Sequence, residues 1–273
     1  MDLYRGMDRA ALDAAYNNSA AVPDARAVHA DWLIRSQATR ERLGGLSDLA
    51  YGPEPRNRID WFPAGAAEAP TLVFIHGGYW QSRDKEDFAF IADGPVARGF
   101  NVALVEYTLA PAARMTAIVG EIGHALDFLA AKLPELGAEQ GRICLAGHSA
   151  GGHLAVSHRA HPAVSAVFGI SGLYELEPIG RNYLNDKLRL DAAEIAAFSP
   201  IRHIRAGAPV LLTVGAAELP ELIRQTEDYA AAAEAAGEAV SLIPAPGHDH
   251  FTVLEMLARP DSTALDALVS RMS

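Results

Sequence analysis

A serine enclosed by glycines lies near the middle of the chain. It is Ser149 in the pentapeptide GHSAG (147–151), which follows the apolar run ICLA (143–146). Gly-x-Ser-x-Gly is typical of a nucleophile on a sharp turn between a strand and a helix, where the glycines let the two elements approach closely. The same serine could instead be the N-cap of that helix. We favour the nucleophile, because a hydroxyl presented at the carboxyl edge of a sheet is placed to meet a ligand.

A serine hydroxyl needs a base to accept its proton. The histidines that follow the last predicted strand are His248 and His250. We favour His250, because the apolar run that begins directly after it, at Phe251, could dock in the core and fix the loop. His248 remains the alternative. The two could also form a metal-binding pair, but the sequence offers no convincing third ligand, so we expect no metal site.

The base in turn needs a carboxylate that holds its tautomer and stabilises the imidazolium. Glu218 lies directly after the predicted strand at 209–215, and Glu221 lies inside the helix that follows. Glu218 is the better placed, since Glu221 is also explained as an acid favoured by the helix dipole. The order Ser149, Glu218, His250 is the chain order expected of α/β-hydrolases.

A glycine turn after an early strand is the candidate oxyanion hole. In HGGYW (76–80), the backbone N–H groups of Gly77 and Gly78, with that of Ala150, could converge on a developing oxyanion. Each such donor contributes about 3–4 kcal/mol of transition-state stabilisation. A plain glycine turn is the alternative. It leaves unexplained why the turn occurs together with the elbow, the acid and the late histidine, in that order.

Residues beside these motifs are candidates for the substrate pocket: His76, Tyr79, Trp80 and His148. Tyr79 and Trp80 follow the glycine turn and could form an aromatic wall. Trp80 could equally belong to the core.

The elements that must position these residues alternate along the chain. Several apolar runs carry no polar alternation, as in strands covered on both faces, which favours a parallel sheet. Helical periodicity occurs between them, and this alternation predicts an α/β fold. The strands are predicted at 58–62, 71–77, 101–109, 143–147, 163–171, 209–215 and 239–245, and the helices near 85–98, 114–133, 150–160, 220–236 and 261–272.

Two segments lie outside this alternation, and we expect both to belong to one domain over 1–273. Residues 1–50 carry helical patterns that end at Gly44 and Gly45, so we expect N-terminal helices there. Residues 174–200 are polar and irregular and separate two predicted strands, which is typical of a lid or binding loop.

The motifs together resemble those of the kynurenine formamidase (arylformamidase) group of esterase/lipase-like α/β-hydrolases. That group has HGGxW where related lipases have HGGG. The similarity extends from YNNSAAVP (16–23) through YLNDKLRLD (183–191) to HDHFTVLEML (248–257). The resemblance implies an α/β-hydrolase fold, and it assigns the nucleophile, histidine, acid and oxyanion motif to Ser149, His250, Glu218 and 76–80. Characterised members of the group have aspartate where this chain has Glu218.

The resemblance also implies hydrolysis of a small acyl amide or ester without a metal or organic cofactor. The first candidate is a formyl group on an aryl amine, and a carboxylesterase acting on small acyl or aryl esters is the alternative. A catalytically silent binding protein on the same scaffold is the alternative from another class. A carboxylate on the substrate could be contacted by Arg181, Asn182 or Tyr183.

Composition limits the partners and the compartment. A net charge of −11 over 273 residues disfavours nucleic acid and anionic membranes. Cys144 is the single cysteine and the N-terminus lacks the apolar core of a signal peptide, so we expect a cytoplasmic protein. No run approaches the roughly 20 apolar residues of a membrane span. A homodimer is one assembly that the sequence leaves open.

Overall fold

A computed structural model describes residues 4–272. Eight strands form one sheet in the order β1-β2-β4-β3-β5-β6-β7-β8. The sequence predicted seven of them and missed the first, which occupies the last residues of the segment expected to be helical. The strands are β1 (Leu46–Ala50), β2 (Arg58–Phe62), β3 (Ala69–Ile75), β4 (Asn101–Val105), β5 (Ala138–His148), β6 (Val164–Ile170), β7 (Val210–Gly215) and β8 (Val240–Ala245).

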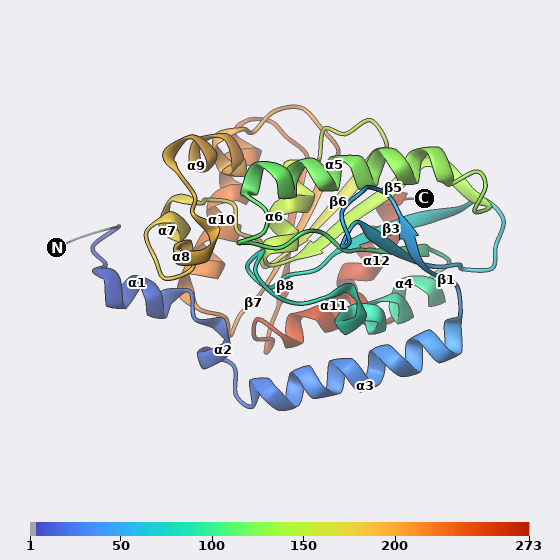
Figure 1. Ribbon diagram of the computed structural model, residues 1–273, viewed down its shortest axis with the longest axis horizontal. Coiled ribbons are helices and arrows are strands. Elements are labelled where there is room, and N and C mark those ends of the chain that lie inside the picture. Colours follow the sequence, from blue (N-terminus) through green and yellow to red (C-terminus); the bar gives the residue numbers. More distant parts are fainter. Residues whose placement is uncertain (1–3, 273) are drawn as a thin grey trace.

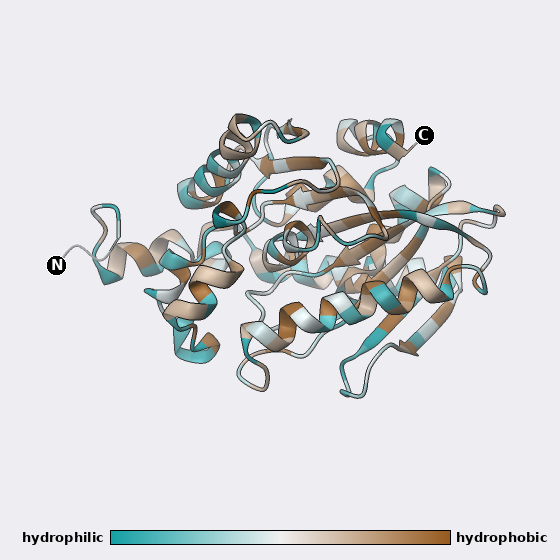
Figure 2. Ribbon diagram, turned by 90° about the horizontal axis from the view of Figure 1, so that it is seen from above, coloured by the Kyte–Doolittle hydropathy of each residue, from teal (hydrophilic) through white to brown (hydrophobic). Residues whose placement is uncertain are grey.

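The sheet is mostly parallel, as predicted. Only β1 with β2 and β2 with β4 pair antiparallel among the strands described, and every other neighbouring pair is parallel. Successive side chains of a strand point to opposite faces. In β3, Val73 and Ile75 therefore pack into the core on one face, while Leu72 and Phe74 pack into the core on the other. Figure 2 shows the apolar strands at the centre of the molecule.

Helices cover both faces of the sheet (Figure 1). α5 (Met115–Lys132), α6 (Ala150–Ser157) and α10 (Pro220–Ala235) contribute buried residues to one core. α3 (Ala25–Leu43), α11 (Glu255–Ala258) and α12 (Thr263–Met272) contribute to the other, with the 3₁₀ helix Lys85–Ala92 and the short α4 (Asp93–Ala97) beside them. The predicted α/β-hydrolase fold is confirmed.

The N-terminal segment folds as α1 (Arg9–Ala15), α2 (Asn18–Ala21) and α3. α3 lies along one side of the molecule (Figure 1) and buries Trp32 against Phe88 and Phe90 of the 3₁₀ helix, with ring centroids 5.3 and 5.8 Å apart. The long helix therefore anchors the N-terminal segment to the body of the fold.

The 174–200 segment is more ordered than the sequence indicated. It forms α7 (Glu177–Gly180), α8 (Asn185–Leu188) and α9 (Ala192–Phe198), whose Ile179 and Leu188 are buried. Such short helices show too few turns for periodicity to reveal them, and packing stabilises them instead. The segment contacts the N-terminal helices, since the Tyr183 N–H donates to the Asp13 carboxylate at 2.8 Å.

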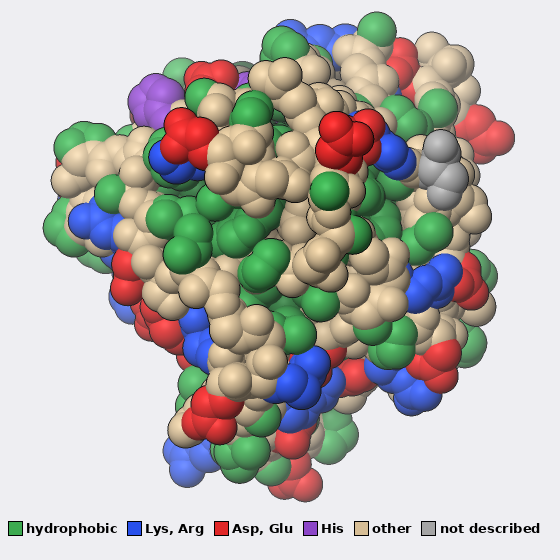
Figure 3. Space-filling view, turned by 90° about the vertical axis from the view of Figure 1, so that its right-hand side faces the viewer, with side chains coloured by type: hydrophobic (Ala, Val, Ile, Leu, Met, Phe, Trp, Pro, Cys, Tyr) green, Lys and Arg blue, Asp and Glu red, His purple; other side chains and the backbone are tan. Residues whose placement is uncertain are grey.

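The surface mixes both signs of charge. Figure 3 shows acidic and basic side chains interspersed among apolar ones on the face it presents. Among residues 4–272, no helix has both the length and the apolar character required to cross a bilayer.

Candidate active site

Ser149 lies on a strained turn between β5 and α6. Its φ of 55° and ψ of −117° fall outside the regions that L-residues prefer. Its N–H donates to the Ile170 carbonyl at 2.8 Å, which ties the turn to β6. The flanking glycines are sterically required: a Cβ on Gly151 would lie 1.9 Å from the Ile75 oxygen, and one on Gly147 would lie 2.1 Å from the Gly151 oxygen.

His250 and Glu218 form a buried pair. The distance from His250 Nδ1 to Glu218 Oε2 is 2.6 Å, and the two side chains are 5% and 0% exposed. Since the carboxylate accepts from Nδ1–H, Nε2 is left to accept a proton. The other Glu218 oxygen accepts from the Ser171 hydroxyl and from the Gly215 N–H, at 2.8 Å for the latter. These two hydrogen bonds therefore hold the carboxylate in place, and the carboxylate in turn orients the imidazole.

The alternative acid and base make other contacts. Glu221 accepts from the Tyr16 hydroxyl at 3.0 Å and from Arg224 at 2.8 Å. The main-chain oxygen of His248 accepts from the Ala217 N–H at 3.0 Å. The structure thus brings together Glu218 and His250, the two residues that the sequence favoured.

The glycine turn packs directly against the elbow. A Cβ on Gly77 would lie 3.1 Å from Cβ of Ser149, and one on Gly78, whose φ is +106°, would lie 2.2 Å from the Ser82 oxygen. Ala150 is the first residue of α6. The first N–H groups of a helix have no partner within the helix and carry partial positive charge. Donors suited to an oxyanion therefore flank the serine on two sides.

His76 supports the glycine turn from behind. Its Nδ1 lies 2.7 Å from the Gly77 oxygen and its Nε2 lies 3.0 Å from Glu106 Oε1. Burial favours a raised pKa for Glu106, but the charges and hydrogen bonds of His76, Arg56 and the Lys85 N–H hold that pKa below its usual value.

The predicted pocket roles of His76 and Trp80 need correction. His76 is 1% exposed and stacks on Tyr107, with ring centroids 4.5 Å apart. Trp80 is fully buried and packs edge-on against His153 at 5.0 Å. Both side chains are buried, and neither lines the pocket that opens at Ser149. For Trp80, the core interpretation left open by the sequence agrees with the structure.

A pocket of about 90 Å³ opens at the elbow. The predicted Tyr79 and His148 line it, together with Ser149, His250 and the glycine turn. Further lining residues come from α2, α3, the segment after the turn and the loop after His250, and the sequence assigned none of them to a pocket: Asn18, Ser19, His29, Trp32, Ser82, Arg83, Phe88 and Phe251. The available signal was proximity to motifs, since Asn18 and Ser19 lie inside YNNSAAVP and Ser82 and Arg83 closely follow HGGYW.

His148 is neutral and braces the loop that carries His250. Burial and the neighbouring His250 hold its pKa well below the usual value. Its Nε2–H donates to the main-chain oxygen of His250 at 2.8 Å.

The 174–200 residues proposed to contact a substrate carboxylate do not line this pocket in the described structure. Arg181 pairs with Glu177 at 2.5 Å, Asn182 is fully buried, and the Tyr183 main chain bonds to α1. Residues of the N-terminal helices α2 and α3 line the site instead.

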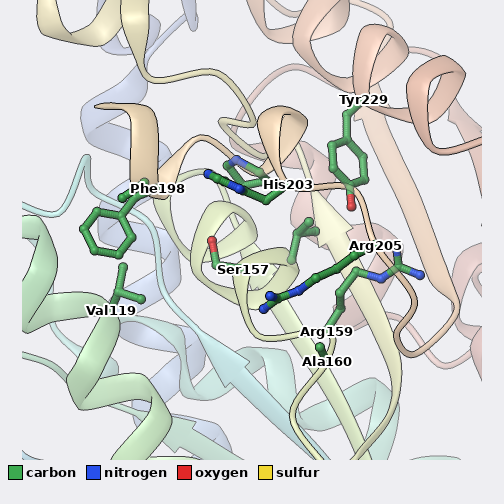
Figure 4. Close-up of a pocket in the computed structure, with 11 residues that line it drawn as sticks. Val119, Ser157, Arg159, Ala160, Phe198, His203, Arg205 and Tyr229 are labelled. Atoms are coloured by element: carbon green, nitrogen blue, oxygen red, sulfur yellow. The ribbon is translucent and has the colours of Figure 1, made fainter. Parts of the chain in front are cut away.

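A larger cavity, of about 270 Å³, lies between α5, α6, α9 and α10 (Figure 4). Ser157, His203, Arg205 and Tyr229 are among the side chains around it, and its lining within residues 4–272 includes neither Ser149 nor His250. The smaller pocket is therefore the candidate active site, because its serine lies on the strained turn and its histidine is paired with Glu218.

Comparison with known proteins identifies the family. The BD-FAE family model matches residues 61–163. The chain is 27% identical to the kynurenine formamidase of Danio rerio over 94% of both proteins. It is 30% identical to the kynurenine formamidase of Drosophila melanogaster, over 80% of this chain and 78% of that protein. This chain belongs to the kynurenine formamidase family.

Solved structures agree with this family assignment. A protein of Silicibacter sp. TM1040, provisionally described as a thioesterase, matches with a TM-score of 0.85 and 32% identity, covering 96% of this chain and 98% of that one. The Pyrobaculum calidifontis esterase matches with a TM-score of 0.71, but at 19% identity that likeness shows the fold alone. As a member of this family the chain is a hydrolase, which sets aside the catalytically silent alternative.

Proposed function

We propose that this enzyme is an arylformamidase that removes a formyl group from an aromatic amine, with Ser149, His250 and Glu218 as its triad. The observation that carries the proposal is the pocket itself. It is narrow, about 90 Å³, and Trp32, Phe88 and Phe251 line it beside the serine. A narrow site suits the smallest acyl group, and aromatic walls suit an aryl leaving group.

The proposed reaction is acyl transfer to water. Ser149 Oγ attacks the formyl carbon while His250 Nε2 accepts the hydroxyl proton, and Glu218 stabilises the imidazolium. The N–H groups of Gly77, Gly78 and Ala150 stabilise the oxyanion of the tetrahedral intermediate.

The intermediate then collapses. His250 returns its proton to the aryl nitrogen, the C–N bond breaks, and the amine leaves. Water, deprotonated by the same imidazole, attacks the formyl-enzyme and releases formate and free Ser149.

The named relatives support an aryl formamide of the N-formylkynurenine type as the small-molecule substrate. A carboxylesterase or thioesterase is the second candidate, because it would use the same residues and because the Silicibacter neighbour is described as a thioesterase.

Steady-state kinetics on N-formylkynurenine, p-nitrophenyl acetate and an acetyl thioester separate these activities. The proposal predicts the highest kcat/KM for N-formylkynurenine. Hydrolysis of the ester or thioester without turnover of the formamide would reject it.

We further propose a cytoplasmic enzyme made of one domain. Its single cysteine, Cys144, is buried in β5, which suits a reducing compartment. A homodimer stays a prediction, and light scattering on the purified chain tests it.

A further inference from the structure

A cationic side chain lies beside the proposed oxyanion turn. Arg83 lines the same pocket as Ser149, and its side chain is 31% exposed. A Cβ placed on Gly78 would lie 2.9 Å from Arg83 Cγ, so the stem of the arginine packs directly on the turn. Arg83 itself has a φ of 81°. Such a conformation is costly for a residue with a side chain, so the surrounding structure must hold it.

The charge of Arg83 is only weakly compensated. Within residues 4–272 its one ion pair is with Asp87, at 3.8 Å, which exceeds hydrogen-bond distance. Its Nη2 lies 2.7 Å from the ring nitrogens of His29. Burial and Arg83 lower the pKa of His29 to about 4, so this imidazole is neutral and offsets no charge. Burial also lowers the pKa of Arg83.

Aromatic rings connect the proposed base to this guanidinium. The centroids of His250 and Phe251 are 5.9 Å apart, and those of Phe251 and His29 are 4.6 Å apart. Arg83 Nη2 in turn contacts the ring nitrogens of His29. A planar leaving group that lies along these rings would extend from Ser149 toward Arg83.

The side-chain oxygen of Asn18, in the same pocket, has no hydrogen-bond partner among the described residues. The Tyr79 hydroxyl donates its one hydrogen to the Tyr16 oxygen at 2.7 Å, so Asn18 must donate Nδ2–H to that hydroxyl, at 2.9 Å. This fixes the amide orientation and leaves Asn18 Oδ1 buried with no hydrogen-bond partner among residues 4–272. A buried acceptor of this kind is costly unless a ligand N–H reaches it.

We propose that Arg83 binds a carboxylate on the leaving group of the substrate, and that Asn18 Oδ1 accepts a hydrogen bond from the N–H of the same N-formyl aryl amine. Guanidinium groups bind carboxylates through paired hydrogen bonds, and partial burial strengthens them. The inference rests on the proposed function for the identity of the acyl group. The preference for a carboxylate depends only on the pocket and should apply to any acyl donor.

The test uses the full chain and two formamides: N-formylkynurenine, which carries a carboxylate and an ammonium group, and the derivative in which the carboxylate alone is converted to a carboxamide. The wild type should prefer the carboxylate, and Arg83→Gln should lower kcat/KM for it about 10- to 100-fold, mainly through KM. The same variant should stay within about threefold of wild type on the carboxamide. Arg83→Lys should retain part of the preference, because lysine keeps the positive charge but cannot donate the paired hydrogen bonds of a guanidinium group.

Arg259→Gln is the matched control, since Arg259 is 61% exposed and pairs with Asp261. It removes one positive charge from the molecule and should leave both substrates unaffected. Equal losses on both substrates in Arg83→Gln, or no charge preference in the wild type, would overturn the inference and make Arg83 a support of the turn.

A second substrate pair separates this inference from the proposed function. If the enzyme turns over neither formamide, the arylformamidase proposal fails. 3-Acetoxybenzoate and 3-acetoxybenzamide then test Arg83 on ester hydrolysis. Arg83→Gln should lower kcat/KM for the benzoate and not for the benzamide. Equal losses on both esters would overturn the inference.

Discussion

His148 donates a hydrogen bond from Nε2 to the main-chain oxygen of His250, 2.8 Å away. The residue before the proposed nucleophile thus holds the loop that carries the proposed base. The two rings also contact each other, with centroids 4.6 Å apart. The elbow and the C-terminal loop are separated by about a hundred residues in sequence, yet this contact fixes the position of one relative to the other.

Loss of this brace should impair turnover without unfolding the protein. His148→Leu removes the donor and should lower kcat about 10- to 100-fold, because small displacements of a catalytic group are expensive. His148→Gln can still donate to the same oxygen and should lose less. Steady-state kinetics with circular dichroism checks this, and equal losses in the two variants would show that the hydrogen bond is not the cause.

The carboxylate of Glu218 should matter through the tautomer that it imposes. Glu218→Gln keeps the shape but can present an N–H to Nδ1 of His250, and kcat should fall about 10³- to 10⁴-fold. Glu221→Gln is the matched control and should cost at most a few-fold, since Glu221 bonds to Tyr16 and Arg224. If Glu221→Gln were the damaging change, the acid would be wrongly assigned.

Buried neutral histidines should make stability depend on pH. Burial lowers the pKa of His153 to about 4 and that of His148 well below 6.5. In the unfolded chain both protonate near pH 6.5. Their contribution to the free energy of unfolding is therefore complete above about pH 6.5. It is lost as the pH falls toward the pKa values of the folded state.

Denaturant unfolding between pH 7 and pH 5 measures this effect. The free energy of unfolding should fall by up to about 1.4 kcal/mol per pH unit for each histidine. In His153→Gln, the dependence of the unfolding free energy on pH should be less steep by the amount that one histidine contributes. A flat profile, or an unchanged slope in the variant, would contradict the assignment.

The glycines at the elbow should not tolerate a methyl group. Gly151→Ala would force a Cβ to 1.9 Å from the Ile75 oxygen, and we expect it to lower both stability and activity. Gly120→Ala is the matched control, because Gly120 is inside α5 with nothing near its Cβ position. The control should stabilise the protein by about 0.5–1 kcal/mol. Thermal unfolding compares the two, and a neutral Gly151→Ala would contradict the packing described.

The sequence predicted the parallel strands well because they are buried on both faces and read as uninterrupted apolar runs. It missed β1, whose side chains are largely exposed and carry no such pattern. The motif residues were identifiable because strained turns require glycines at fixed spacing. Pocket residues such as His29 of α3 and Arg83 were not identifiable, since their place in the pocket depends on tertiary packing, which leaves no local pattern in the sequence.

The nucleophile is the central claim, and covalent labelling tests it most directly. The intact chain is treated with a fluorophosphonate, and its mass and the modified peptide are determined. The account predicts one adduct on Ser149 and none on folded Ser149→Ala. A folded wild-type protein without an adduct, or an adduct that persists in Ser149→Ala, would contradict it.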